Sequence, residues 1–366
     1  MLKKDTNNHS NIPLLIIASA VVIIGLIYFA DILTPLALAV FLWLTIDGAA
    51  QLVHTKYKFV PRKFALPLIL IIVFLGLAAI VAFIGDYARS FAHDMGAYKI
   101  RIDQVIAGFY EKFPSLGIAP TIGELFEKVS PALILNKLGE VLKGFGSEAL
   151  FVLIYVLSLF AAQASLPKKI VNIFSNTKER DRFVAIGLAI RKSMEAYLWV
   201  QTITGAMIAI ACYILFLILG LKNALFWALL TFLLSYIPAI GGLVATLLPC
   251  VFALVQFTSI LPSISILIIT QIIQFVIGNI IQPRMTGDSL NISILMVFLS
   301  LAFWGQIWGA SGMFLAVPIS VMMMIIMAQF PSTRPLAILM SANGKPDVEI
   351  KLQRKAKNSS VIDEEK

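Results

Sequence analysis

The chain is poor in charged residues and in cysteine. Only 13% of its 366 residues are Asp, Glu, Lys or Arg, whereas 59% are apolar. A soluble globular domain is nearer a quarter charged and half apolar. The mean hydropathy is +0.91, and the apolar residues are gathered in long uncharged runs. This composition excludes a soluble globular protein and predicts an integral membrane protein.

Cysteine and histidine are too few and too scattered for a metal or redox centre. Cys212 and Cys250 lie in separate apolar runs, and neither a CxxC nor an HExxH spacing occurs. Gly-x-Ser-x-Gly and Walker-type phosphate loops are also absent from the sequence. We therefore expect no enzyme activity, no metal, no cofactor and no direct use of ATP.

The net charge of +9 is distributed over short loops and the C-terminal tail. A nucleic-acid surface would need one basic patch, so we expect no nucleic acid as a partner. Residues 54–63 carry four basic residues and residues 167–197 carry seven. Because Lys and Arg are enriched in cytoplasmic loops, both segments and both termini are predicted to face the cytoplasm.

The apolar runs predict an all-α polytopic membrane protein with six to ten membrane segments, in contact with membrane lipid. The first spans are expected at 12–30, 32–53 and 64–85, with a tight turn at Asp31–Pro35. Four regions follow: N-terminal spans at 1–85, an amphipathic extracytoplasmic insert at 86–147, a transport core at 148–330 and a polar cytoplasmic tail at 331–366. The insert either lies on the membrane surface, forms a small cap, or packs against the spanning core or a neighbouring subunit.

Two helical pairs in the C-terminal half are broken by proline or glycine. The first break, with Pro238 and Gly241-Gly242, interrupts Asn223–Pro283, which is 61 residues without a charge. The second break is the glycine-rich segment Gly305–Gly312. Each broken pair is either two full crossings or one re-entrant hairpin. Interrupted segments of this kind point to the substrate site of a transporter, because a broken membrane helix needs protein or water around it.

A stripe of amide side chains lies between the two breaks. At 100° per residue, Gln271, Gln274, Gly278 and Gln282 fall within roughly 80° of one another, with Asn279 at the margin. Such amides either bond to a neighbouring helix or line a path for a polar solute. The predicted substrate path comprises Pro238, Gly241, Gly242, Gln271, Gln274, Gly278, Asn279, Gln282, Pro283 and Arg284.

Two charged residues allow more than one interpretation. Asp47, near the inner end of the second span, either binds a proton or Na⁺ or pairs with Lys56 or Lys58, and we favour the pair. Arg284 either meets an anionic solute or caps the inner end of its span, which is the commoner arrangement.

Three segments of the C-terminal half resemble, in order and spacing, the signatures of the autoinducer-2 exporter (AI-2E) family of transporters. They are Ser235-Tyr-Ile-Pro-Ala-Ile-Gly-Gly, the segment Gly278-Asn-Ile-Ile-Gln-Pro-Arg-Met-Thr-Gly-Asp-Ser-Leu-Asn-Ile-Ser, and the segment Ser300–Pro318. The opening spans and the amphipathic insert are similar to the family in layout. The chain departs from many members at Ile277-Gly278, where they carry an acid, and at Tyr197-Leu-Trp-Val-Gln201, which replaces a more polar element.

The resemblance implies a homo-oligomer in a bacterial-type inner membrane. It also implies export of a quorum-sensing furanosyl compound or, as in other members, Na⁺/H⁺ exchange. Our leading hypothesis is a secondary carrier or facilitator that exports a small polar organic solute along the amide stripe and both breaks. A cation/proton antiporter that uses Asp47 is the first alternative, and a membrane scaffold or regulator without transport is the second.

Overall fold

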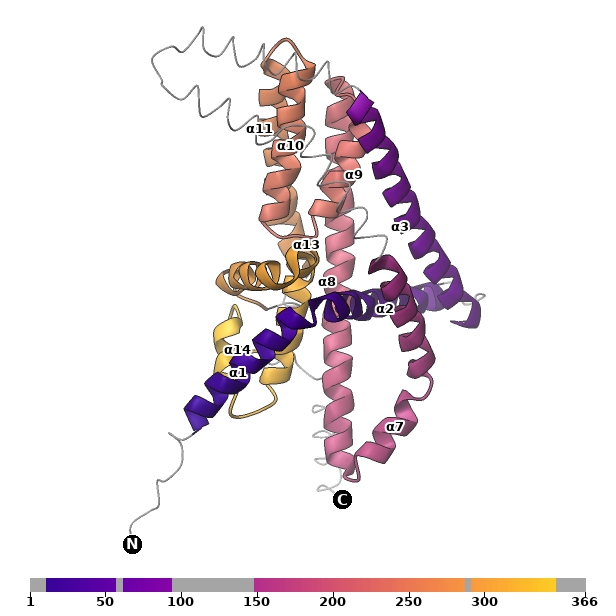
Figure 1. The fold of residues 1–366 in the computed structure, drawn as a ribbon, viewed down its shortest axis with the longest axis vertical. Coiled ribbons are helices and arrows are strands. Elements are labelled where there is room, and N and C mark those ends of the chain that lie inside the picture. Colours follow the sequence, from indigo (N-terminus) through magenta and orange to yellow (C-terminus); the bar gives the residue numbers. More distant parts are fainter. Residues whose placement is uncertain (1–10, 57–61, 94–147, 287–290, 347–366) are drawn as a thin grey trace, which may run out of the picture. The chain divides into compact units, whose positions relative to one another are not determined.

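The computed structural model describes residues 11–56, 62–93, 148–286 and 291–346, and these residues are almost entirely helical (Figure 1). Within these ranges the only extended pairing is an isolated bridge between Ile292 and Ser341. Most of the amphipathic insert predicted at 86–147 and most of the polar tail lie outside the described residues. The helices are α1 (Asn11–Tyr28), α2 (Ala30–Lys56), α3 (Arg62–His93), an unnumbered helix Glu148–Gln163, α7 (Leu166–Ile173), α8 (Thr177–Ile218), α9 (Ala224–Leu234), α10 (Ile240–Gln256), α11 (Leu261–Val276), the π-helix η2 (Ile277–Ile281), α12 (Gln282–Thr286), α13 (Ile294–Met327) and α14 (Arg334–Met340).

Five of these helices are long and apolar enough to cross a membrane, and the count is six if the bent pair Glu148–Gln163 and α7 forms one span. The chain is thus an all-α, multi-pass membrane protein, as the apolar runs predicted. α9 has 11 residues, which is about 16 Å of helix. The hydrocarbon core is about 30 Å thick, so α9 does not cross it alone.

The chain divides into two compact units. Unit 1 comprises Met1–Trp43, Ala149–Ile190 and Asn291–Lys366, and unit 2 comprises Leu44–Glu148 and Arg191–Leu290. Helices α2 and α8 each contribute one end to each unit.

Unit 1 contains the second predicted break, and the break is a sharp kink within α13. Gly309 has φ of 60° and ψ of −139°, which a residue with a side chain rarely adopts. Across the kink, a Cβ atom on Gly312 would lie 1.9 Å from the carbonyl oxygen of Trp304. The two arms are also joined by a hydrogen bond of 2.6 Å from Ser320 Oγ to Ser300 Oγ, both buried. The kink therefore depends on glycine at two positions for two different reasons.

Unit 2 is built around an aromatic core shared by α3, α8, α9, α10 and α11. Tyr87 stacks on Phe226 with ring centroids 3.7 Å apart, and Trp227 packs on Phe252 at 5.1 Å. Helices α10 and α11 run side by side and are joined by a short turn (Figure 1). Ser259 Oγ accepts a hydrogen bond from Leu261 N–H at this turn, and Pro262 fits the first turn of α11 because its nitrogen needs no partner there. This core fixes the helices that carry the first break.

Three element boundaries differ from the predictions. α2 begins at Ala30 and contains Asp31 and Pro35, so the expected turn at Asp31–Pro35 is shortened to Phe29. α8 begins at Thr177, so residues 177–197 of the basic segment continue the membrane helix instead of forming a separate loop. The apolar run 261–281, which predicts one span ending at Ile281, continues as a helix through η2 and α12 to Thr286. Proline does not end the helix in two of these cases: Pro35 lies inside α2, and Pro283 lies in α12 directly after the π-helix η2.

Candidate functional site

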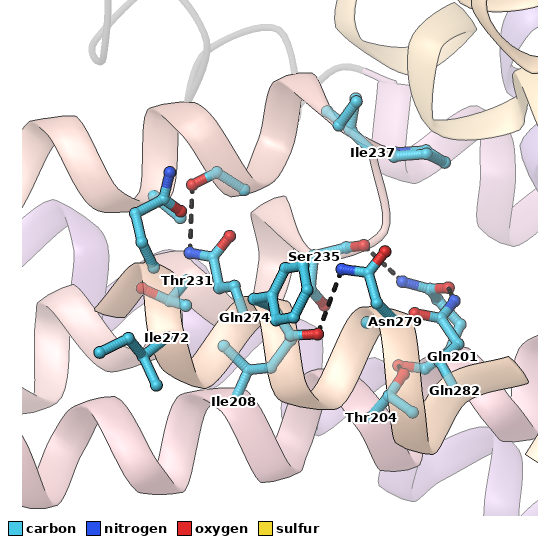
Figure 2. Close-up of a pocket in the computed structure, with 17 residues that line it drawn as sticks. Gln201, Thr204, Ile208, Thr231, Ser235, Ile237, Ile272, Gln274, Asn279 and Gln282 are labelled. Atoms are coloured by element: carbon cyan, nitrogen blue, oxygen red, sulfur yellow. Dashed lines mark hydrogen bonds between the residues drawn. The ribbon is translucent and has the colours of Figure 1, made fainter. Parts of the chain in front are cut away.

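A pocket of about 750 Å³ lies in unit 2 beside the first break (Figure 2). It is formed by α8, α9, the segment between α9 and α10, the first half of α10, α11, η2 and the first residue of α12. None of its 17 described lining residues is charged, and the polar ones offer only amides and hydroxyls. The polar lining residues are Gln201, Thr204, Thr231, Ser235, Gln271, Gln274, Asn279 and Gln282. Such a surface suits a solute that is polar but carries no net charge.

The backbone reverses direction at Ser235–Ala239, between α9 and α10. Ile240 N–H donates to the carbonyl oxygen of Pro238 at 2.7 Å, and Ala239 between them has φ of 59° and ψ of −62°. These values define a γ-turn of the rare, strained kind. Ala239 lines the pocket, so a strained residue sits at the site, as is frequent in functional sites.

The glycine pair acts differently from what its sequence suggests. Gly241 and Gly242 do not supply the unusual backbone conformation; both lie in the first turn of α10. A Cβ on Gly241 would meet the Leu234 carbonyl oxygen at 1.8 Å, and one on Gly242 would meet Gln274 Oε1 at 2.3 Å. The two glycines therefore allow α10 to approach the end of α9 and the side chain of Gln274. The predicted break at Pro238–Gly242 is shifted toward Ser235–Ala239.

Three glutamines hold the walls of the pocket together. Gln274 Nε2 donates to Gly242 O at 3.1 Å and to Thr246 Oγ1 at 3.0 Å, which joins α11 to α10. Gln282 Nε2 donates to Gln201 Oε1 at 3.2 Å, and Gln201 Nε2 donates to Ser235 O (Figure 2). Gln201 is only 6% exposed. This chain of amides links α8, the reversal and the end of the amide stripe.

Two other amides keep polar atoms available. Gln271 is exposed, and its side-chain amide makes no hydrogen bond within the described residues. Asn279 Nδ2 donates to the Phe275 carbonyl at 3.1 Å within its own helix, which leaves its side-chain oxygen without a described donor. Both residues line the pocket. Gln271 and Asn279 can therefore exchange water for a solute at little cost.

The pocket brings together seven of the ten residues predicted for the substrate path. Those seven are Pro238, Gly242, Gln271, Gln274, Gly278, Asn279 and Gln282. Gly241 is buried behind the lining, while Pro283 and Arg284 are exposed and do not line the pocket. The second predicted break, Gly305–Gly312, belongs to unit 1. Sequence reasoning missed Gln201, Thr204, Thr231 and Ser235; a polar residue in an apolar run was the available signal for each.

Asp47 lies outside this pocket and is paired. Its carboxylate is 2% exposed and lies 2.6 Å from an Arg191 guanidinium nitrogen, and Arg191 Nε also reaches Glu195 Oε1 at 2.6 Å. Gly48 permits this arrangement, because a Cβ there would lie 2.9 Å from Glu195 Cγ. The pair with Lys56 or Lys58 that we favoured stays a prediction, because the side chains of both lysines lie outside the described part. Arg191 is a partner for Asp47 that the sequence did not suggest.

Within the described residues, no group of three or more His, Cys, Asp or Glu side chains could hold a metal ion.

A multi-pass helical protein with a broken helix beside an uncharged polar pocket has the architecture of a solute transporter. Comparison with known proteins narrows this class. Residues 15–332 match the AI-2E family transporter model, and the chain belongs to this family.

The relatives are bacterial proteins named as transport proteins, candidate transport proteins or candidate permeases, and their lengths are nearly the same as that of this chain. The AI-2 transport protein TqsA of Escherichia coli is 27% identical over 92% of this chain and 97% of its own. A candidate transport protein of Haemophilus influenzae is 29% identical over 93% of this chain and 98% of its own. The candidate permease PerM of E. coli is 24% identical over 83% of this chain and 89% of its own. The chain is therefore an AI-2E family transporter.

Proposed function

We propose that this transporter exports a small, neutral, polar organic solute of the autoinducer-2 type through the pocket in unit 2. The observation that carries the proposal is the pocket lining, which is rich in amides and hydroxyls and has no charged side chain among the described residues. A charged solute would lose its hydration there without a counter-charge, whereas a neutral polar solute exchanges hydrogen bonds with water for hydrogen bonds with amides. The name of TqsA supports the solute class.

The membrane placement is part of the proposal. The chain lies in a bacterial inner membrane with both termini in the cytoplasm, because the basic residues are concentrated in segments 54–63 and 167–197. The insert at 86–147 then faces the extracytoplasmic side, and the tail at 331–366 faces the cytoplasm. The family resemblance supports a homo-oligomer.

The pocket residues divide into two roles. Gln271 and Asn279 contact the solute, because each has polar atoms without a described partner. Gln274, Gln282 and Gln201 hold the framework, because their amides are already bonded between elements. α9 and α10 form a re-entrant hairpin whose reversal reaches the solute, a role supported by the short length of α9.

The test is transport of autoinducer-2 in proteoliposomes that contain the purified protein. Gln271→Leu removes a free amide and is expected to lower kcat/KM about fivefold through KM, with unchanged thermal unfolding, because one hydrogen bond contributes about 1 kcal/mol. Gln274→Leu is expected to lower the unfolding midpoint as well, since it separates α10 from α11. Ser265→Ala on α11 is the control, because its hydroxyl bonds only to Leu261 O of its own helix. Unchanged flux in Gln271→Leu would refute its contact with the solute.

The two alternatives give different results in the same vesicles. For a cation/proton antiporter, a pH gradient drives ²²Na⁺ flux that Asp47→Asn abolishes. The Arg191 pair favours a structural role for Asp47, so we expect no such flux. A scaffold or regulator moves neither autoinducer-2 nor Na⁺.

A further inference from the structure

The carbonyl oxygen of Gly278 is a hydrogen-bond acceptor that the helix itself leaves unused. In an α-helix, the N–H of residue 282 would donate to the carbonyl of residue 278. Here the N–H of Gln282 donates to the Ile277 carbonyl instead, because residues 277–281 form a π-turn. In a continued π-turn the donor to residue 278 would be the N–H of residue 283. Residue 283 is proline, which has no N–H.

No described side chain takes over this acceptor. No side chain in the described ranges donates to Gly278, and Gly278 is not among the residues with a further interaction. A Cβ atom built on Gly278 would meet nothing within 4 Å, so there is open space on the side of the helix where a side chain at this position would project. Gly278 lines the pocket. The acceptor and the open space thus belong to the same pocket-lining residue, and a backbone acceptor is costly to leave without a donor in a membrane.

We propose that the Gly278 carbonyl accepts a hydrogen bond from a hydroxyl group of the transported solute, and that Pro283 keeps this acceptor free. The inference rests on the proposed function, because it assigns a contact to the solute in the same pocket. A hydroxyl group supplies the single donor that the carbonyl needs. A cation is disfavoured, since the described lining offers no carboxylate to balance its charge.

Gln271 and Asn279 complete the recognition surface. Gln271 lies seven residues before Gly278, which is two helical turns on the same face, and its amide can both donate and accept. The free side-chain oxygen of Asn279 is a second acceptor next to the carbonyl. Two acceptors beside one free amide match a solute with several neighbouring hydroxyl groups. A π-turn followed by proline is thus a recognition device in this family member.

The experiment restores or withholds a single N–H at position 283. Pro283→Ala adds a donor that can bond to the Gly278 carbonyl and mask it. The matched control places lactic acid, the hydroxy-acid analogue of alanine, at position 283 by nonsense suppression; it has the same methyl group but an ester oxygen in place of the N–H. Autoinducer-2 transport and ²²Na⁺ flux are measured in proteoliposomes. Hydrogen exchange of the backbone amide that Pro283→Ala introduces is measured in detergent without solute.

We expect Pro283→Ala to raise KM for autoinducer-2 about three- to tenfold, which corresponds to the loss of one hydrogen bond. The KM of the ester variant should stay within about twofold of the wild-type value. Equal effects of the two substitutions would overturn the proposal, because the proline ring and not the missing N–H would then matter. A change confined to ²²Na⁺ flux would also overturn it.

The exchange measurement separates this proposal from the proposed function. If wild-type vesicles do not move autoinducer-2, the proposed function fails for that solute, while exchange still tests the acceptor. Protection of the introduced amide from exchange is the result expected if it bonds to the Gly278 carbonyl. That result would support the proposal that the carbonyl is free in the wild type. Rapid exchange of that amide would refute the free acceptor.

Discussion

The close approach of α9 and α10 predicts a severe effect of a single methyl group at Gly241. In Gly241→Ala, the new Cβ would lie 1.8 Å from the Leu234 carbonyl oxygen, whereas real Cβ atoms essentially never come within 3.0 Å of another heavy atom. The obstacle is backbone and cannot rotate away. The two segments must therefore separate by more than 1 Å, which strains the reversal and the bond of 3.0 Å from Gly241 N–H to Ile237 O.

We expect Gly241→Ala to lower the free energy of unfolding by about 1–3 kcal/mol, the usual cost of inserting a methyl group into a packed site. The loss would exceed any gain in helix propensity, which is at most about 1 kcal/mol for Gly to Ala. Transport should fall as well, because Pro238 and Gly242 on either side line the pocket.

The assay is thermal unfolding of the purified protein in detergent, followed by tryptophan fluorescence, because Trp227 in α9 is part of the core of unit 2. Gly187→Ala is the matched control: this glycine is exposed within α8, and a Cβ there would meet nothing within 4 Å. It should be neutral or slightly stabilising. A midpoint for Gly241→Ala equal to that of the wild type would refute the proposed packing of the hairpin.

Two further predictions concern other contacts. Gly312→Ala should destabilise unit 1 in the same way, because its Cβ would lie 1.9 Å from the Trp304 carbonyl oxygen, and an unchanged unfolding midpoint would contradict the kink geometry. Arg191→Ala should cost about 3–5 kcal/mol, because it leaves the buried Asp47 carboxylate without its guanidinium. The double variant Asp47→Asn/Arg191→Gln should recover much of that loss in the same unfolding assay; equal losses would show that the pair is not the cause.

The class of protein follows from the sequence because membrane solvation acts locally. A span needs about 20 apolar residues wherever it lies in the chain, so the composition and the run lengths are sufficient to predict it. The face of the amide stripe also follows from the sequence, because helical periodicity fixes which side chains lie together. The residues Gln271, Gln274, Gly278 and Gln282 do line one pocket.

The tertiary structure decided which polar side chains are paired with one another and which keep free hydrogen-bonding atoms. Gln282 meets Gln201 across 81 residues of sequence, and Asp47 meets Arg191 from another helix, so no local pattern reveals either pair. The strained backbone conformation is at Ala239 and not at the glycines. Glycine is required at position 241 for a different reason, the close approach of α10 to the Leu234 carbonyl. The sequence thus determined a helical membrane protein with an amide-bearing path. Packing alone decided its free hydrogen-bonding groups, because these depend on partners far apart in the chain.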